Sequence, residues 1–101
     1  MRRRYYSHYT YIHPDIYLKN YVIGLDYTNH IIEYFPFEKE VESTEFYSGM
    51  LIFLPQNISI TDILPHIEQN KAIFGINNKK PVIQDVKYSI YNEDGCVILS
   101  S

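Results

Sequence analysis

Five apolar residues in a row, positions 50–54, lie between Gly49 and Pro55. A short continuous apolar run that begins and ends at chain-breaking residues is typical of a strand buried on both faces. We therefore predict a central strand at residues 49–54, on which the rest of the chain is organised.

Before this run, residues 3–12 are rich in β-forming side chains. From Tyr5 onwards, Tyr9 and Tyr11 alternate with polar residues, which predicts one aromatic face and one polar face. Pro14 removes a backbone donor, so we expect the first strand to end just before it.

Two further strands, at residues 20–26 and 30–36, are predicted to form a hairpin. Asn29 is the expected pivot of the turn, because asparagine tolerates a left-handed backbone. The charged stretch that follows, residues 38–42, is typical of a solvated loop or an exposed edge.

After Pro55, residues 61–70 predict one short helix. Thr61 or Asp62 is its expected N-cap, and Pro65 would then fall in the first turn, where its missing donor matters least. Four apolar residues recur at helical spacing and are expected to pack on the sheet: Ile60, Ile63, Leu64 and Ile67.

The chain ends in a second predicted hairpin, with strands at 82–92 and 96–100. Asp94-Gly95 lies between them, and this pair favours a tight turn with positive φ at both central positions. Together, the elements predict a single mainly β domain over residues 1–101, a small antiparallel β-sandwich or barrel-like fold with one short α-helix.

Composition adds 11 tyrosines and no tryptophan. Tyrosines on sheet faces with their hydroxyl groups in water would account for this content, and a recognition surface is the alternative. The candidate interaction surface consists of five aromatic residues: Tyr5, Tyr9, Tyr11, Tyr34 and Phe35.

The net charge of −3 argues against broad nucleic-acid binding, which needs a basic patch. Residues 2–4 are arginines, and we interpret them as the solvated start of the first strand. No apolar segment has the length of a secretion signal or of a membrane span. The single cysteine, Cys96, fits a reducing cytoplasm, and its apolar surroundings predict a buried, inert thiol.

No group of residues predicts catalysis, a metal ion or a cofactor. His8, His13, His30 and His66 show no paired metal-ligand spacing. The alternating glutamates of 38–45 resemble a solvated face, and the motifs of a phosphate-binding loop and of a serine nucleophile elbow are absent from the sequence.

The order of these segments resembles the start of metal-dependent amidohydrolases, the relatives of cytosine and aminofutalosine deaminases. The matching segments are Arg3-Arg4-Tyr5, residues 21–26, residues 30–33, and Tyr47-Ser48-Gly49 leading to Leu54-Pro55. The resemblance implies the small β-sandwich of that family, with residues 79–99 as its closing strands.

The same resemblance fails where the family binds its metal. The positions of the family's two metal-binding histidines fall on Thr61 and Ile63, and neither side chain replaces an imidazole ligand. The roughly 250 residues of a catalytic (β/α)8 barrel are also absent.

We therefore expect a non-catalytic domain that acts through protein contacts, with itself as a homodimer or with another protein. An accessory subunit of an amidohydrolase and a small-ligand binding domain with an aromatic groove are the alternatives.

Overall fold

Six strands form one sheet in the order β3-β2-β1-β4-β5-β6. The computed structural model describes residues 3–39, 41–76 and 85–100. The strands are β1 (Arg3–Ile12), β2 (Ile16–Leu25), β3 (Ile31–Pro36), β4 (Thr44–Pro55), β5 (Tyr88–Asn92) and β6 (Val97–Leu99). Helix α1 (Ile60–Gln69) and the short 3-10 helix η1 (Lys71–Ile73) follow β4. The prediction of a mainly β domain with one α-helix is confirmed.

The sheet is mixed and not purely antiparallel, because β1 and β4 run parallel. All other neighbouring strands are antiparallel. The chain leaves β3, crosses the sheet through the segment that begins at Phe37, and returns on the far side of β1. A parallel pair needs such a crossover, and a sequence pattern that is local to each strand does not reveal it.

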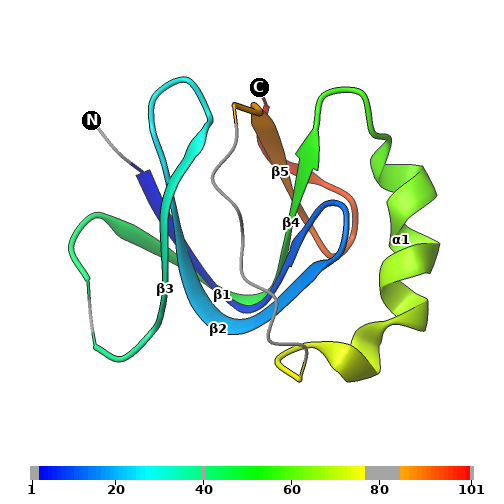
Figure 1. The fold of residues 1–101 in the computed structure, drawn as a ribbon, viewed down its shortest axis with the longest axis horizontal. Helices are drawn as coiled ribbons and strands as arrows, with labels where there is room; N and C mark the ends of the chain where they lie inside the picture. The colour runs from blue at the N-terminus through cyan, green and yellow to red at the C-terminus, as the bar shows by residue number, and fades with distance from the viewer. Residues whose placement is uncertain (1–2, 40, 77–84, 101) are drawn as a thin grey trace.

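The long strands bend, and the sheet has the shape of a U in Figure 1. Ser7 and Thr10 mark the bend in β1: they lie three positions apart, yet their hydroxyl oxygens are 2.6 Å apart on the same face. Asn20, on the facing strand, has a φ of 58°. Because side chains of a regular strand alternate with a period of two, a three-residue step exchanges the two faces of β1. The predicted single aromatic face of β1 is therefore wrong.

The inside of the U holds the larger core, in which the two arms of the sheet pack against each other. The arms also meet through their backbones, because His30 and Lys87 form a β-bridge and the Tyr88 amide donates to the Asn29 carbonyl at 2.9 Å. The sheet thus folds back on itself. The buried residues of this inner core are Tyr5, Ile12, Ile16, Leu18, Ile23, Leu25, Ile31, Leu51, Phe53, Tyr88 and Ile90.

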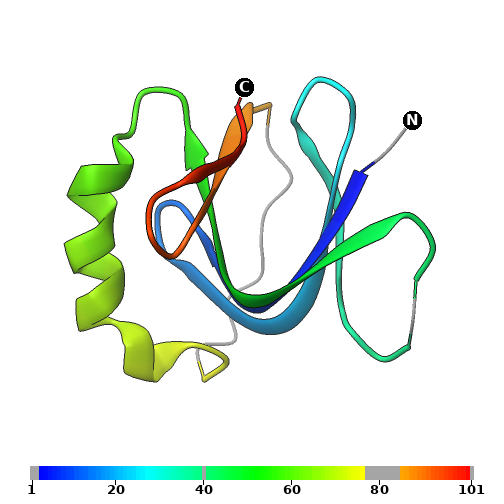
Figure 2. The same ribbon diagram turned by 180° about the vertical axis from the view of Figure 1, so that it is seen from behind.

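A second core lies on the outside of the U, where α1 packs against one arm (Figures 1 and 2). Ile67 is its buried helical residue, and the predicted helical stripe packs there as expected. The strand residues beneath the helix include Tyr11, Tyr17, Ile52 and Leu54. The central strand is confirmed as buried on both faces, because consecutive residues of 50–54 belong alternately to the two cores.

Several predicted boundaries move. β2 begins at Ile16 and not at residue 20, because it pairs with β1 from the Ile12–Ile16 position onwards. Helix α1 begins at Ile60 after Ser59, so Pro65 lies inside the helix, where it cannot donate to the carbonyl four residues earlier. In both cases, the element extends beyond the range that the sequence pattern predicts, because of strand pairing or packing.

The two predicted turns are present. Asn29 has a φ of 68°, as expected for the pivot of the β2–β3 turn. In the last hairpin, Gly95 has a φ of 85° and its amide donates to the Asn92 carbonyl, but Asp94 has no positive φ. The loop is thus a turn followed by a left-handed glycine, and the predicted pair of positive φ values is wrong. The predicted strand at 82–92 is too long, because β5 begins at Tyr88 and residues 85–87 form only the isolated bridge of Lys87. Positions 82–84 lie outside the described residues.

Candidate binding surfaces

Two of the five predicted surface residues belong to the cores. Tyr5 is 4% exposed on the inside of the U, and Tyr11 is fully buried on the outside. The Tyr11 hydroxyl donates to the Pro14 carbonyl at 2.7 Å, and burial raises the pKa of Tyr11 to about 12. Neither residue can form a contact surface, and the two do not share a face.

The other three predicted residues are half-buried and lie in three different places. Tyr34 packs against the inner core, and Tyr9 packs beside the helical core. Phe35 pairs with Val22 across β2 and β3. The structure therefore does not bring the five residues together, and Phe35 is the member that lies in the row described next.

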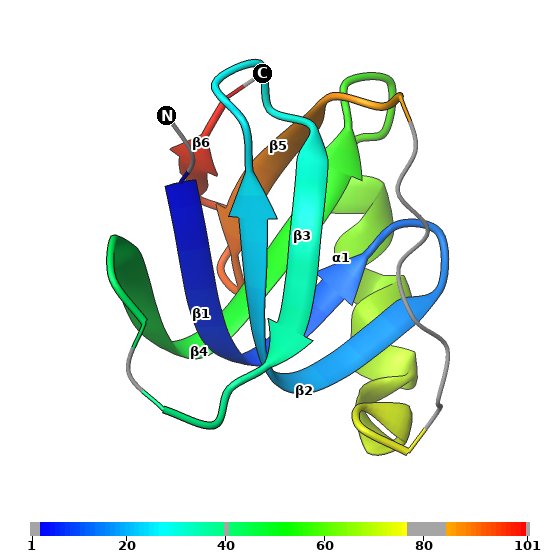
Figure 3. The ribbon, with the colours of Figure 1, turned by 60° about the vertical axis from the view of Figure 1, so that its left-hand side comes forward.

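A row of apolar side chains crosses four strands on the outer face of the arm that α1 does not cover. Cross-strand partners lie on the same face, and the pairs are Phe35 with Val22, Val22 with Tyr6, and Tyr6 with Phe46. We call these four residues the outer aromatic row. Figure 3 shows the four strands side by side, with α1 behind the other arm.

Phe37 caps this row from the crossover segment. Its ring centroid lies 4.9 Å from that of Tyr6 and 5.8 Å from that of Phe46. The Tyr6 hydroxyl donates to Asn20 at 2.8 Å, which fixes the ring. Phe46 is nevertheless 48% exposed, so the row presents a fixed aromatic edge to solvent.

An open backbone edge lies beside Phe46. β4 pairs with β5 only from Leu51 to Pro55, and among the described residues nothing pairs with positions 44–49 on the side away from β1. Unpaired amides and carbonyls of this kind are able to accept another strand. The aromatic row and the open edge thus meet at one end of β4.

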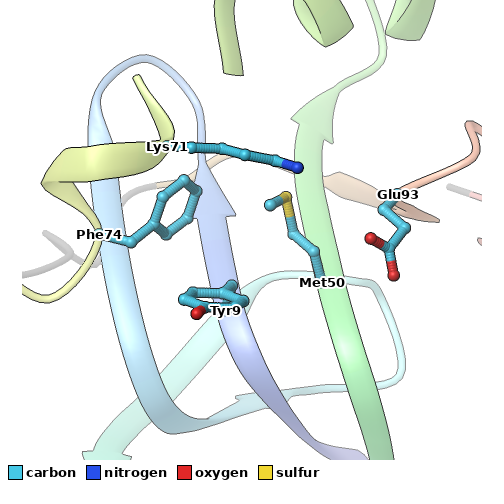
Figure 4. Close-up of a pocket in the computed structure, with 5 residues that line it drawn as sticks. All are labelled: Tyr9, Met50, Lys71, Phe74 and Glu93. Atoms are coloured by element: carbon cyan, nitrogen blue, oxygen red, sulfur yellow. The ribbon is translucent and has the colours of Figure 1, made fainter. Parts of the chain in front are cut away.

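A pocket of about 180 Å³ lies between the sheet and η1, and Figure 4 shows its lining residues. Tyr9, Met50 and Phe74 form its apolar walls, and the side chains of Lys71 and Glu93 extend towards Met50 from opposite sides. The rings of Tyr9 and Phe74 meet edge to face at 5.5 Å. The sequence-based assignment missed this pocket apart from Tyr9.

The histidines do not form a metal centre in the part of the chain that the structure describes, where no group of three or more His, Cys, Asp or Glu residues is arranged to hold a metal ion. His30 contacts Asp85 through Nε2 at 2.8 Å and Thr28 through Nδ1 at 2.7 Å. Hydrogen bonds from the His30 amide and from Thr28 lower the pKa of Asp26. These contacts fix the β2–β3 turn against the segment that leads into β5.

Cys96 is exposed, which corrects the prediction of a buried thiol. It follows the turn glycine and precedes β6, where the outer neighbour Val97 is also 59% exposed. The apolar neighbours that suggested burial lie at the edge of the sheet.

Comparison of the chain with protein-family models, curated proteins and solved structures gave no match. None of the helices in the described ranges has the length and apolar character needed to cross a membrane.

Local sequence patterns indicate neither the outer aromatic row nor the pocket. Phe46 and Tyr6 belong to strands far apart in the sequence, and only the parallel register of β1 and β4 makes them neighbours. Lys71 follows the helix and Glu93 lies in a turn, so each resembles an ordinary solvated charge. Their proximity depends on the packing of α1 against the sheet.

Proposed function

We propose that this chain is a non-catalytic domain that acts by binding protein through the outer aromatic row and the open edge of β4. The observation that carries the proposal is the position of Phe46, which is 48% exposed and lies in contact with the fixed rings of Tyr6 and Phe37. Aromatic residues held on rigid strands are enriched where proteins meet, and they lose little entropy on binding.

A second copy of the chain is the partner that this geometry supports. An edge strand that pairs with its own symmetry mate forms a self-complementary contact, which is the simplest way to cover an open edge. Antiparallel pairing of positions 44–49 in two copies would also place the two Phe46 rings near the shared interface. A stable interface buries about 1,200–2,000 Å² in total, so the row and the edge must both contribute.

Light scattering coupled to size exclusion tests this proposal. The unaltered chain should form a dimer at high micromolar concentration, and Phe46→Ser should shift the mass towards the monomer without changing the circular dichroism spectrum. Val97→Ser serves as the matched control, because Val97 is a comparably exposed apolar residue on a different strand, β6. A strict monomer, or equal effects of the two substitutions, would contradict the proposal.

The resemblance to the amidohydrolase β-sandwich stays a prediction, as does an accessory role beside a hydrolase supplied by another chain. Co-purification of a hydrolase with the unaltered chain, and its loss with Phe46→Ser, would identify that chain as the partner of the same surface.

A further inference from the structure

The geometry points to the pocket between β4 and η1 as a binding site for a small zwitterion with an apolar side chain, the class of a free aliphatic amino acid. In Figure 4, Lys71 and Glu93 approach Met50 from opposite sides. This site includes no residue of the outer aromatic row, although Glu93 lies over Gly49 at the end of the open edge of β4, and it does not depend on the protein-contact proposal.

Each charged group is available to a ligand. Among the described residues, no hydrogen bond or ion pair involves the Glu93 side chain. Lys71 contacts Glu68 at 3.4 Å, but both side chains are more than half exposed, and surface pairs of this kind contribute little. No ion pair within the described part of the chain joins Lys71 to Glu93. A ligand that carries both a carboxylate and an ammonium group would form an ion pair with each of the two side chains.

Glu93 extends over the backbone of β4 from the turn between β5 and β6. Its carboxylate lies directly over Gly49, where any Cβ would collide with it. The turn that carries Glu93 is fixed by Asn92, whose side-chain oxygen accepts hydrogen bonds from the amides of Asp94 and Cys96, both at 2.9 Å. Glycine at position 49 thus allows an acid to reach the rim of the pocket.

The apolar walls of the pocket favour an apolar side chain on the ligand. Met50 and Phe74 are buried, and Tyr9 closes the floor beside them. The volume of the pocket is about 180 Å³. It is therefore smaller than a drug-sized site and suits a compact aliphatic side chain.

Titration of the full chain with free leucine, followed through the Met50 methyl signal in NMR spectra, tests this site. N-acetyl-leucine lacks the ammonium group and leucinamide lacks the carboxylate, so each should bind about tenfold more weakly, as expected for the loss of one charge-assisted contact. Leucine that causes no saturable shift would overturn the proposal, as would equal binding of the three compounds.

Four variants test the paired charges. Lys71→Glu and Glu93→Lys should each weaken leucine binding by about tenfold, and the double exchange should restore it, because the ligand can then bind in the reverse orientation. Gly49→Ala changes no charge and should weaken binding by displacing Glu93. Failure of the double exchange to restore binding, with the fold intact by circular dichroism, would count against the paired-charge site.

Discussion

The two arms of the bent sheet cover their outer faces in different ways. On one arm, α1 places Ile67 on Ile52 and Leu54, and all three are at most 3% exposed. On the other arm, no helix of the described residues covers the outer face; the side chains of the sheet and Phe37 shield it, and Phe46 stays 48% exposed.

On the arm without a helix, an ion pair that lies over a glycine covers part of the outer face. Arg4, Gly24 and Glu33 are cross-strand neighbours, and Arg4 Nε contacts Glu33 Oε2 at 3.0 Å over the glycine. Both side chains are about one-fifth exposed. The outer face of one arm is therefore covered by the apolar packing of α1, and that of the other by an ion pair beside the outer aromatic row. The arm without the helix is the one suited to contact another protein.

The largest difference between the arms should appear when side chains are removed from β4 on its outer face. Leu54→Ala should lower the free energy of unfolding by about 2–5 kcal/mol, because Leu54 is fully buried beneath α1. Phe46→Ala on the uncovered arm should cost about 1 kcal/mol, mainly through lost ring contacts. Urea denaturation measures both values.

Hydrogen exchange provides the control for that pair. In Leu54→Ala, the amides of α1 should exchange faster than those of β2, because the helix loses its docking site. Equal costs for the two substitutions would mean that the arms are covered equally well.

A rise to alkaline pH should act on the tyrosines that pack in the two cores. Burial raises the pKa of Tyr11 to about 12, above its unfolded value of 10.0, so the neutral phenol is favoured in the folded state. The stabilisation is fully present below pH 10 and is lost as the pH rises through the folded pKa. Burial also raises the pKa values of Tyr5, Tyr17, Tyr47 and Tyr88.

Thermal melts across alkaline pH measure this loss. Tyr11→Phe should flatten the decline, although it also removes the hydrogen bond to Pro14. An unchanged alkaline decline in Tyr11→Phe would assign the effect to the other buried tyrosines.

The elements with strong local signals could be predicted from the sequence. The apolar run at 50–54, the pivot at Asn29 and the helical stripe that contains Ile67 each depend on residues a few positions apart. Local chemistry decides such features, because turn geometry and helical periodicity act over one or two turns of chain.

The arrangement of the sheet and the candidate surfaces could not be predicted in this way. Tyr5 and Tyr11 fall in different cores because of the three-residue step between Ser7 and Thr10, which no alternation pattern contains. The aromatic row depends on the register of β1 with β4, whose paired residues are about 40 positions apart. Strand register is set by the buried face as a whole, so single strands do not specify it.

The smallest expected effect tests the ion pair on the uncovered arm. A Cβ at position 24 would collide with the side chain of Glu33, so Gly24→Ala should cost about 1 kcal/mol and weaken the contact with Arg4. In a Glu33→Ala background the collision is absent, and the same substitution should then stabilise the strand by about 0.5–1 kcal/mol, because alanine loses less backbone entropy than glycine. Urea denaturation of the four chains measures this reversal of sign. An equal cost in both backgrounds would show that position 24 needs glycine for its backbone, and that the ion pair does not replace the helix as the cover of this arm.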